Sequence, residues 1–237
     1  MCTVSFVNAN GKIILTSNRD EQVERPALEP RSYRIGNKNI FFPKDTKAGG
    51  TWFAVAENGN AIVLLNGASE GHEWKPPYRK SRGLIVLDLI SADFPISEWE
   101  TIDLVNIEPF TLVLYEKQKL YQLRWNGLDK ESLELNPAHN YIWSSSTLYP
   151  QNIRETRTHW FEQFLDTKPE VNESEMFNFH RYTEDANHEN GLVINRNGFL
   201  KTLSITQTVI ENGRVNLVHH DLLGQQEFAN SFLIVSP

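Results

Sequence analysis

The chain begins with two stretches of β-strand pattern, separated by a turn signal, within its first twenty residues. Residues 2–7 alternate with a period of two, which predicts a β-strand. Residues 8–11, Asn-Ala-Asn-Gly, form a turn signal, and residues 12–17 read as the returning strand. We therefore expect a hairpin that brings residues 18–21 back beside Cys2.

The same pattern predicts further hairpins, because Asn-Gly or short polar runs separate apolar segments. Paired strands are expected over residues 52–56 with 61–65, 111–115 with 120–125, and 202–210 with 215–220. Short single strands are expected near residues 39–42 and 140–144. Prolines and a Gly-Gly pair predict that the rest of residues 22–50 is mostly loop.

Helical periodicity is confined to the middle of the chain. Ser81 can cap a well-buried helix that runs to about Ala92. Further helices are expected over residues 97–105, 150–165 and 173–180. Strand blocks on either side of helix blocks favour an α+β fold with antiparallel hairpins, and the length suits a single domain, residues 1–237.

Composition narrows the classes of partner. A formal net charge of −7 disfavours nucleic acid and anionic membrane, since both bind basic surfaces. We expect no membrane span and no signal peptide, because neither pattern of apolar residues is found. A single cysteine suits a reducing cytoplasm. We therefore expect a cytoplasmic protein whose partner is a small molecule; the sequence leaves the oligomeric state open.

Cys2 is the strongest candidate for a reactive side chain, because it directly follows the first methionine. Removing Met1 would leave a thiol and a free α-amine on one residue, and the amine could accept the thiol proton. Arg19 could lower the pKa of that thiol further. The alternative is a small buried hydrophobic residue on a strand face, and the position beside residues 18–21 favours the nucleophile.

The three charges that follow the hairpin carry the next candidate roles. Asp20 could hydrogen-bond to the α-amine or thiol of Cys2, and Arg19 could stabilise the thiolate or bind an anionic substrate group. Glu21 could hold Arg19. The alternative is a solvated charged turn after a strand. Asn66 could donate its amide to a developing oxyanion, or could simply form an Asn-Gly turn.

These residues resemble a known family. A cysteine at position 2 followed by a hairpin and Ser-Asn-Arg-Asp-Glu is similar to the NRDE family, also called the transport and Golgi organisation protein 2 family. The likeness covers nearly the whole chain and includes Phe-Pro-Lys-Asp at 42–45, Ala-Gly-Gly-Thr-Trp at 48–52 and Leu-Leu-Asn-Gly at 64–67. That family resembles the N-terminal nucleophile (Ntn) hydrolases, especially the penicillin V acylase and choloylglycine hydrolase group.

The resemblance implies a four-layer αββα sandwich with two stacked, mainly antiparallel sheets. It implies that Cys2, Arg19, Asp20 and Asn66 form the catalytic site, with Asn18, Trp52 and Ser145 at the substrate. Ser145 stands where the acylases carry an asparagine donor, and Leu203 stands where the family carries a late arginine. In the acylases an arginine also precedes the aspartate by three positions, where this chain has Ser17.

Two functions therefore stay open. The first is a cysteine Ntn hydrolase that cleaves a non-peptide amide through an acyl-enzyme without a cofactor. The second is a binding or trafficking protein on the same scaffold for a hydrophobic, haem- or lipid-related metabolite. The intact Cys2 and Asp20 favour the enzyme, and the departures at Ser145 and Leu203 favour the binding protein.

Two further sequence patterns each have a functional and a non-functional interpretation. The segment 72–82, HEWKPPYRKSR, reads either as a solvated loop or as a carboxylate or phosphate contact near a helix N-terminus. His219, His220 and Asp221 could suggest a metal site. Adjacent strand residues point to opposite faces, so we do not expect them to share a metal ion.

Overall fold

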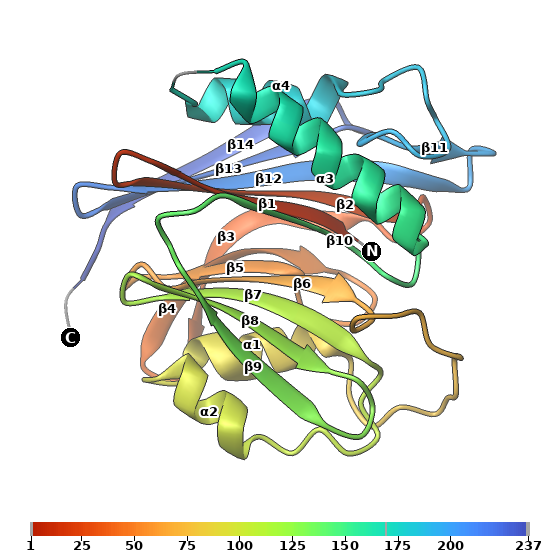
Figure 1. The fold of residues 1–237 in the computed structure, drawn as a ribbon. Helices are drawn as coiled ribbons and strands as arrows, with labels where there is room; N and C mark the ends of the chain where they lie inside the picture. The colour runs from red at the N-terminus through yellow and green to blue at the C-terminus, as the bar shows by residue number, and fades with distance from the viewer. Residues whose placement is uncertain (1, 169, 236–237) are drawn as a thin grey trace.

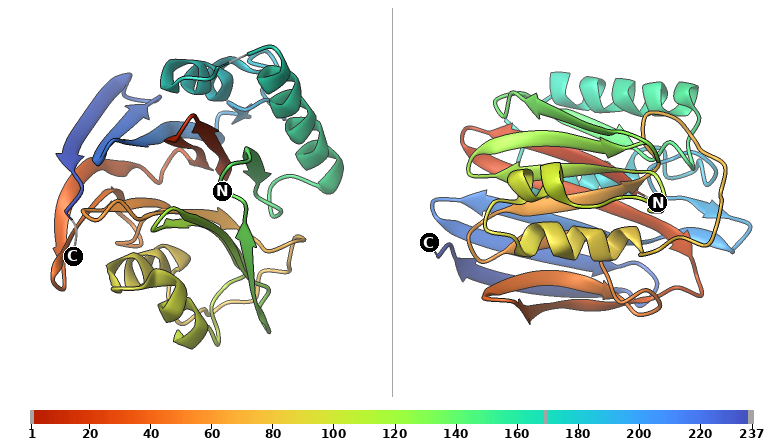
Figure 2. Two further views of the ribbon diagram at one scale, coloured as in Figure 1. Left: turned by 60° about the vertical axis from the view of Figure 1, so that its left-hand side comes forward. Right: turned by 90° about the horizontal axis from the view of Figure 1, so that it is seen from below.

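Two antiparallel sheets lie face to face between two layers of helices (Figure 1). The computed structural model describes residues 2–168 and 170–235. Helices α3 and α4 cover the outer face of the first sheet, and α1 and α2 cover the outer face of the second, as the view from below also shows (Figure 2). The expected αββα sandwich is therefore confirmed.

The first sheet contains the first and the last strand of the described chain. Its strands, in spatial order, are β10 (Tyr141–Ser144), β1 (Cys2–Ala9), β2 (Lys12–Gln22), β12 (Leu200–Glu211), β13 (Arg214–Asp221) and β14 (Gln226–Leu233), with β11 (Asn195–Arg196) beside β12. The predicted N-terminal hairpin thus occupies the middle of a sheet, with β10 and β12 on its two sides.

The second sheet follows the order of the chain. Its strands are β3 (Ala27–Ile35), β4 (Lys38–Asp45), β5 (Phe53–Ala56), β6 (Ala61–Asn66), β7 (Phe110–Glu116), β8 (Lys119–Trp125) and β9 (Lys130–Leu135). The helices are α1 (Arg82–Ser91), α2 (Pro95–Thr101), α3 (Gln151–Asp166) and α4 (Glu173–Tyr182). Among the described residues, no helix is long and apolar enough to cross a membrane.

The apolar faces of the elements form two cores. The larger core fills the space between the sheets and continues under α1 and α2, and the smaller lies between the first sheet and α3 and α4. Phe6 belongs to the larger core and Val7 to the smaller, as the two-residue period of a strand requires. The N-terminal hairpin therefore contributes side chains to both cores.

This alternation separates the residues expected at the site. Cys2 lies directly opposite Arg19 across the β1–β2 ladder, so both side chains point between the two sheets. Asn18 and Asp20 flank Arg19 and point to the helical side instead. The hairpin therefore presents a thiol and a guanidinium on one face and a carboxylate on the other.

Four strands, β3, β9, β11 and β14, were not predicted from the sequence, and β4 is longer than expected. Residues 22–50 contain the long hairpin of β3 and β4, whereas the sequence pattern predicted mostly loop. β3 and β9 are edge strands of the second sheet and β14 is an edge strand of the first, and each leaves many side chains exposed, so their sequences lack an apolar run.

Candidate active site

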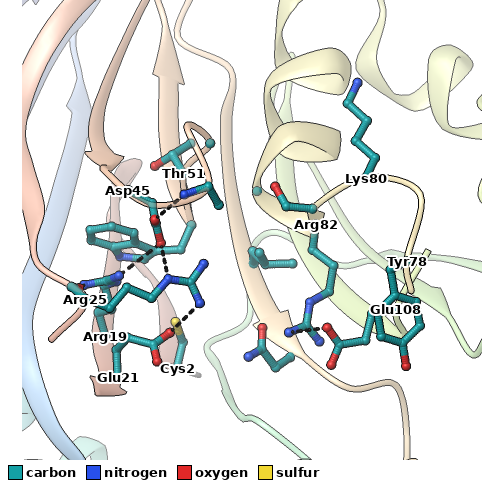
Figure 3. A pocket seen from close by; sticks show the side chains of 17 residues that line it. Cys2, Arg19, Glu21, Arg25, Asp45, Thr51, Tyr78, Lys80, Arg82 and Glu108 are labelled. Carbon is teal, nitrogen blue, oxygen red and sulfur yellow. Dashed lines mark hydrogen bonds and ion pairs between the residues drawn. The ribbon is translucent and has the colours of Figure 1, made fainter. Parts of the chain in front are cut away.

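A cavity of about 320 Å³ opens where Cys2 meets the second sheet (Figure 3). Four basic side chains and three acidic ones line it, together with Cys2, Trp52, Asn66 and Tyr78. Two groups of charges face each other across the cavity (Figure 3). The first comes from β2, β4 and the chain between β2 and β3, and the second from the start of α1 and the segments around it.

Cys2 lies at the base of this cavity and is 2% exposed. Burial raises the pKa of its thiol, and the nearby Asp20 carboxylate raises it further, whereas the positive charge of Arg19 lowers it. Arg19 therefore acts in the expected direction, but desolvation outweighs the guanidinium and the thiol pKa is raised. A thiol of this kind needs a base beside it to become a thiolate.

Arg19 is held in place on three sides. Its Nη2 lies 3.2 Å from Asp45 Oδ2, its Nη1 donates to the carbonyl of Arg25 at 2.8 Å, and its guanidinium stacks 4.4 Å from the Trp52 ring centroid. A cation this well packed and only 3% exposed is a fixed charge beside the thiol. The predicted residues Arg19 and Trp52 thus belong to one wall of the cavity.

Arg25 completes that wall and was not anticipated. Its Nε lies 2.8 Å from Asp45 Oδ2, and its Nη1 lies 3.2 Å from Glu21 Oε2, so it stands between two carboxylates (Figure 3). Asp45 in turn accepts from the backbone amides of residues 47 and 48. The two arginines of this wall are balanced by two carboxylates, and these ion pairs hold the guanidinium groups in place.

The opposite wall comes from the basic loop before α1. Arg82 pairs with Glu108 at 3.0 Å and donates to the carbonyl of Pro109, and Tyr78 and Lys80 also line the cavity. Of the two interpretations of segment 72–82, the geometry therefore supports contact with the cavity for its last residues. Its exposed Trp74 does not line this cavity.

The side chain of Asp20 points from β2 to the helical side of the sheet and is fully buried. It accepts hydrogen bonds from Tyr149 Oη at 2.7 Å and from Thr202 Oγ1 at 2.6 Å. Burial raises its pKa, and the positive charge of Arg157 is the largest effect in the opposite direction. Among the described residues, Asp20 makes no hydrogen bond with Cys2, although it lies at the same end of the hairpin.

Arg157 is the counter-charge that the sequence did not reveal. It has no exposed surface, donates to Thr3 Oγ1 and to the carbonyl of Gly191, and stacks 3.5 Å from the Tyr149 ring centroid. It reaches Thr3 from α3, so only the tertiary fold brings it to the hairpin. Nothing in the sequence of a helix indicates that one of its arginines contacts a strand at the other end of the chain.

Asn66 and Ser145 connect the strands around the thiol. Asn66 ends β6 and lines the cavity with Cys2. Ser145 does not line it; its amide donates to the carbonyl of Cys2 at 3.0 Å and its hydroxyl to the carbonyl of Asn66 at 2.8 Å. The expected substrate contact of Ser145 is therefore replaced by a link that fixes the thiol strand relative to Asn66.

Asn18 also lies elsewhere than expected. Its amide donates to the carbonyls of His180 and Leu192, and its Oδ1 bonds His180 Nδ1, all on the helical side of the sheet. It is fully buried and does not line the Cys2 cavity. The period of the strand explains this, since Asn18 is adjacent to Arg19 and must point the opposite way.

Leu203 occupies an irregular position in β12. The β2–β12 register shifts between Thr202, which pairs with Asp20, and Ser204, which pairs with Arg19. Such a bulge re-aims the side chains around it. Here it accompanies a hydrogen bond from Thr202 to Asp20, which no sequence pattern indicated. Within the described residues, no three His, Cys, Asp or Glu side chains gather as metal ligands.

Comparison with solved structures defines the class of this fold. Over 97% of this chain and 92% of the other, it is similar to a C2A variant of conjugated bile acid hydrolase from Clostridium perfringens, with 10% identity and a TM-score of 0.56. Over 87% and 92%, it is similar to the Caenorhabditis elegans orthologue of N-acylethanolamine-hydrolyzing acid amidase, with 10% identity and a TM-score of 0.59. The fold is thus Ntn-hydrolase-like, with a buried cysteine near the N-terminus.

The family follows from the sequence itself. The chain belongs to the Transport and Golgi organisation 2 family, whose model matches residues 1–210. A comparison with curated proteins gave no match.

Proposed function

We propose that this protein is an N-terminal-cysteine amidohydrolase that cleaves a non-peptide amide bond of a small acylated metabolite. The observation that carries the proposal is the position of Cys2, which places its thiol in a charged cavity at the free end of β1. No other cysteine exists in the chain to take this role. The proposal includes removal of Met1, which frees the α-amine of Cys2.

The chemistry then needs three groups. The α-amine takes the proton of the Cys2 thiol, and the thiolate attacks the amide carbon. The amine returns that proton to the leaving nitrogen as the C–N bond breaks, which leaves a thioester on Cys2. A water molecule, deprotonated by the same amine, releases the acid and restores the thiol.

Two side chains support these steps from opposite faces of the hairpin. Asp20, buried beneath the strand end, favours the protonated form of the amine and so the charge separation that creates the thiolate. The side-chain amide of Asn66 faces the same cavity as the thiol and makes no hydrogen bond with another described residue. It is therefore free to donate to the oxyanion of the tetrahedral intermediate.

The charged walls bear on the class of substrate. Four basic side chains against three acidic ones give the cavity one surplus positive charge, which favours a substrate with a carboxylate or another anionic group. A cavity with seven charged side chains disfavours a hydrophobic metabolite as its occupant. The binding-protein alternative is therefore the weaker one for this cavity.

An amide-hydrolysis screen tests the proposal. Acylated amino acids, N-acyl lactones and bile-salt-like amides would be incubated with the full chain, and release of the amine would be measured. We expect turnover of an amide with an anionic group, and complete loss of it in Cys2→Ala. Arg34→Gln, an exposed substitution remote from the cavity, is the matched control and should keep full activity. Equal rates for Cys2→Ala and wild type would refute the nucleophile.

A further inference from the structure

A second, smaller cavity lies on the other side of the strand end that carries Asn66. It has a volume of about 170 Å³. Leu64 and Asn66 line the cavity of Cys2, whereas Leu65 and Gly67 line this second one. The alternation of β6 therefore separates the two cavities, and none of the described residues lines both of them. A group bound in the second cavity would be a separate ligand and not part of a substrate attached to Cys2.

Two arginines from distant parts of the chain converge on this cavity. Arg124 comes from β8 and Arg154 from α3, and both line it. The Nε atom of each is buried and has no hydrogen-bond partner among the described residues. A buried donor without a partner costs about 1–3 kcal/mol, and more when the group is charged. A ligand with acceptor oxygens in this cavity would satisfy both donors at once.

The remaining contacts of the two arginines leave most of their charge available. Arg154 Nη1 donates to the carbonyl of Ser69 at 2.9 Å, which is a neutral acceptor. Arg124 Nη1 lies 3.6 Å from Glu131 Oε2, and the Glu131 side chain is 60% exposed. A long ion pair with an exposed carboxylate contributes little. None of the described residues that line the cavity is acidic.

We propose that this cavity binds a phosphate group, with Arg124 and Arg154 as its charge partners. Two guanidinium groups match the charge of a dianion, whereas a single carboxylate would leave one of them uncompensated. Ser144 also lines the cavity, and its hydroxyl makes only a long 3.4 Å contact with Thr3 Oγ1. It can therefore turn to donate to a third phosphate oxygen. The cavity has room for a phosphate group and not for a nucleotide.

Isothermal titration calorimetry of the full chain with inorganic phosphate tests this site. Ionic strength is held constant with sodium chloride, and acetate is the planar, singly charged comparison. We expect saturable binding of one phosphate per chain and weaker binding of acetate. Arg124→Gln and Arg154→Gln should each weaken phosphate binding about 10-fold or more, since each removes a charged hydrogen bond. The matched control Arg34→Gln should bind phosphate like wild type.

Chemical modification of arginines in the wild-type chain tests the same site without relying on the correct folding of any variant. Phenylglyoxal would be added with and without phosphate, and modified arginines would be mapped by mass spectrometry. We expect phosphate to protect Arg124 and Arg154 and to leave the exposed Arg34 unprotected. No saturable phosphate binding, acetate binding as tight as phosphate, or equal protection of Arg34 would overturn the proposal.

Discussion

Acidification should destabilise this protein through two buried histidines. Burial lowers the pKa of His180 from 6.5 to about 3 and that of His219 from 6.5 to about 4. Asn18 accepts from His180 Nδ1 because its own amide already donates to two carbonyls, and Ser5 bonds His180 Nε2 at 2.7 Å. The native state therefore holds a neutral imidazole that cannot gain a proton without being buried as a cation.

The magnitude follows from the difference in proton binding between the folded and unfolded chains. A histidine with a lowered folded pKa contributes stability that is complete above the unfolded value and is lost as the pH falls toward the folded value. Between pH 8 and pH 5, each histidine costs about 2 kcal/mol, since the unfolded imidazole gains a proton and the native one does not. Together they remove about 4 kcal/mol, a large part of a typical 5–15 kcal/mol.

Urea unfolding followed by circular dichroism at pH 8 and pH 5 measures this loss. His180→Gln is the informative variant, because it removes one titration and should reduce the pH-dependent loss by about 2 kcal/mol. Comparison with this variant also corrects for Asp20, whose raised pKa acts in the opposite direction. An equal pH dependence in wild type and His180→Gln would refute the argument that this histidine is held neutral.

Two substitutions test the network around the thiol. Arg157→Met should lower the free energy of unfolding by about 1–3 kcal/mol, because it leaves the buried hydroxyl of Thr3 and the carbonyl of Gly191 without their charged donor; a loss below about 0.5 kcal/mol by urea unfolding would contradict this role. Asn66→Ala should cost about 2.7–4 kcal/mol of transition-state stabilisation, seen as a lower kcat with KM little changed. A change in KM alone would assign Asn66 to substrate binding.

The N-terminal hairpin shows how far the sequence could predict the site. Period-two alternation and an Asn-Gly turn were enough to place residues 18–21 beside Cys2, and the register shows that Arg19 is the residue directly opposite it. The same alternation could also have assigned Asn18 to the other face, but the family resemblance grouped it with the substrate residues. A resemblance transfers residues by position, whereas the direction of a side chain depends on the strand.

The rest of the site depends on contacts that no local pattern encodes. Asp20 is held by Tyr149 and Thr202, which lie 129 and 182 residues away in sequence. Arg25 reaches Asp45 from a short stretch between strands that reads as loop. Burial, which sets the pKa of Cys2, is likewise a property of the packed sheets and not of its neighbours in sequence.

The N-terminal residue of the natively expressed protein tests the central claim most directly. Intact mass and tandem mass spectrometry of the N-terminal peptide would show whether Met1 has been removed and whether Cys2 carries a free amine. The account predicts that the chain begins at Cys2 in the isolated protein. A chain that retains Met1 would have no α-amine on Cys2, and that result would contradict the proposed nucleophile and its base together.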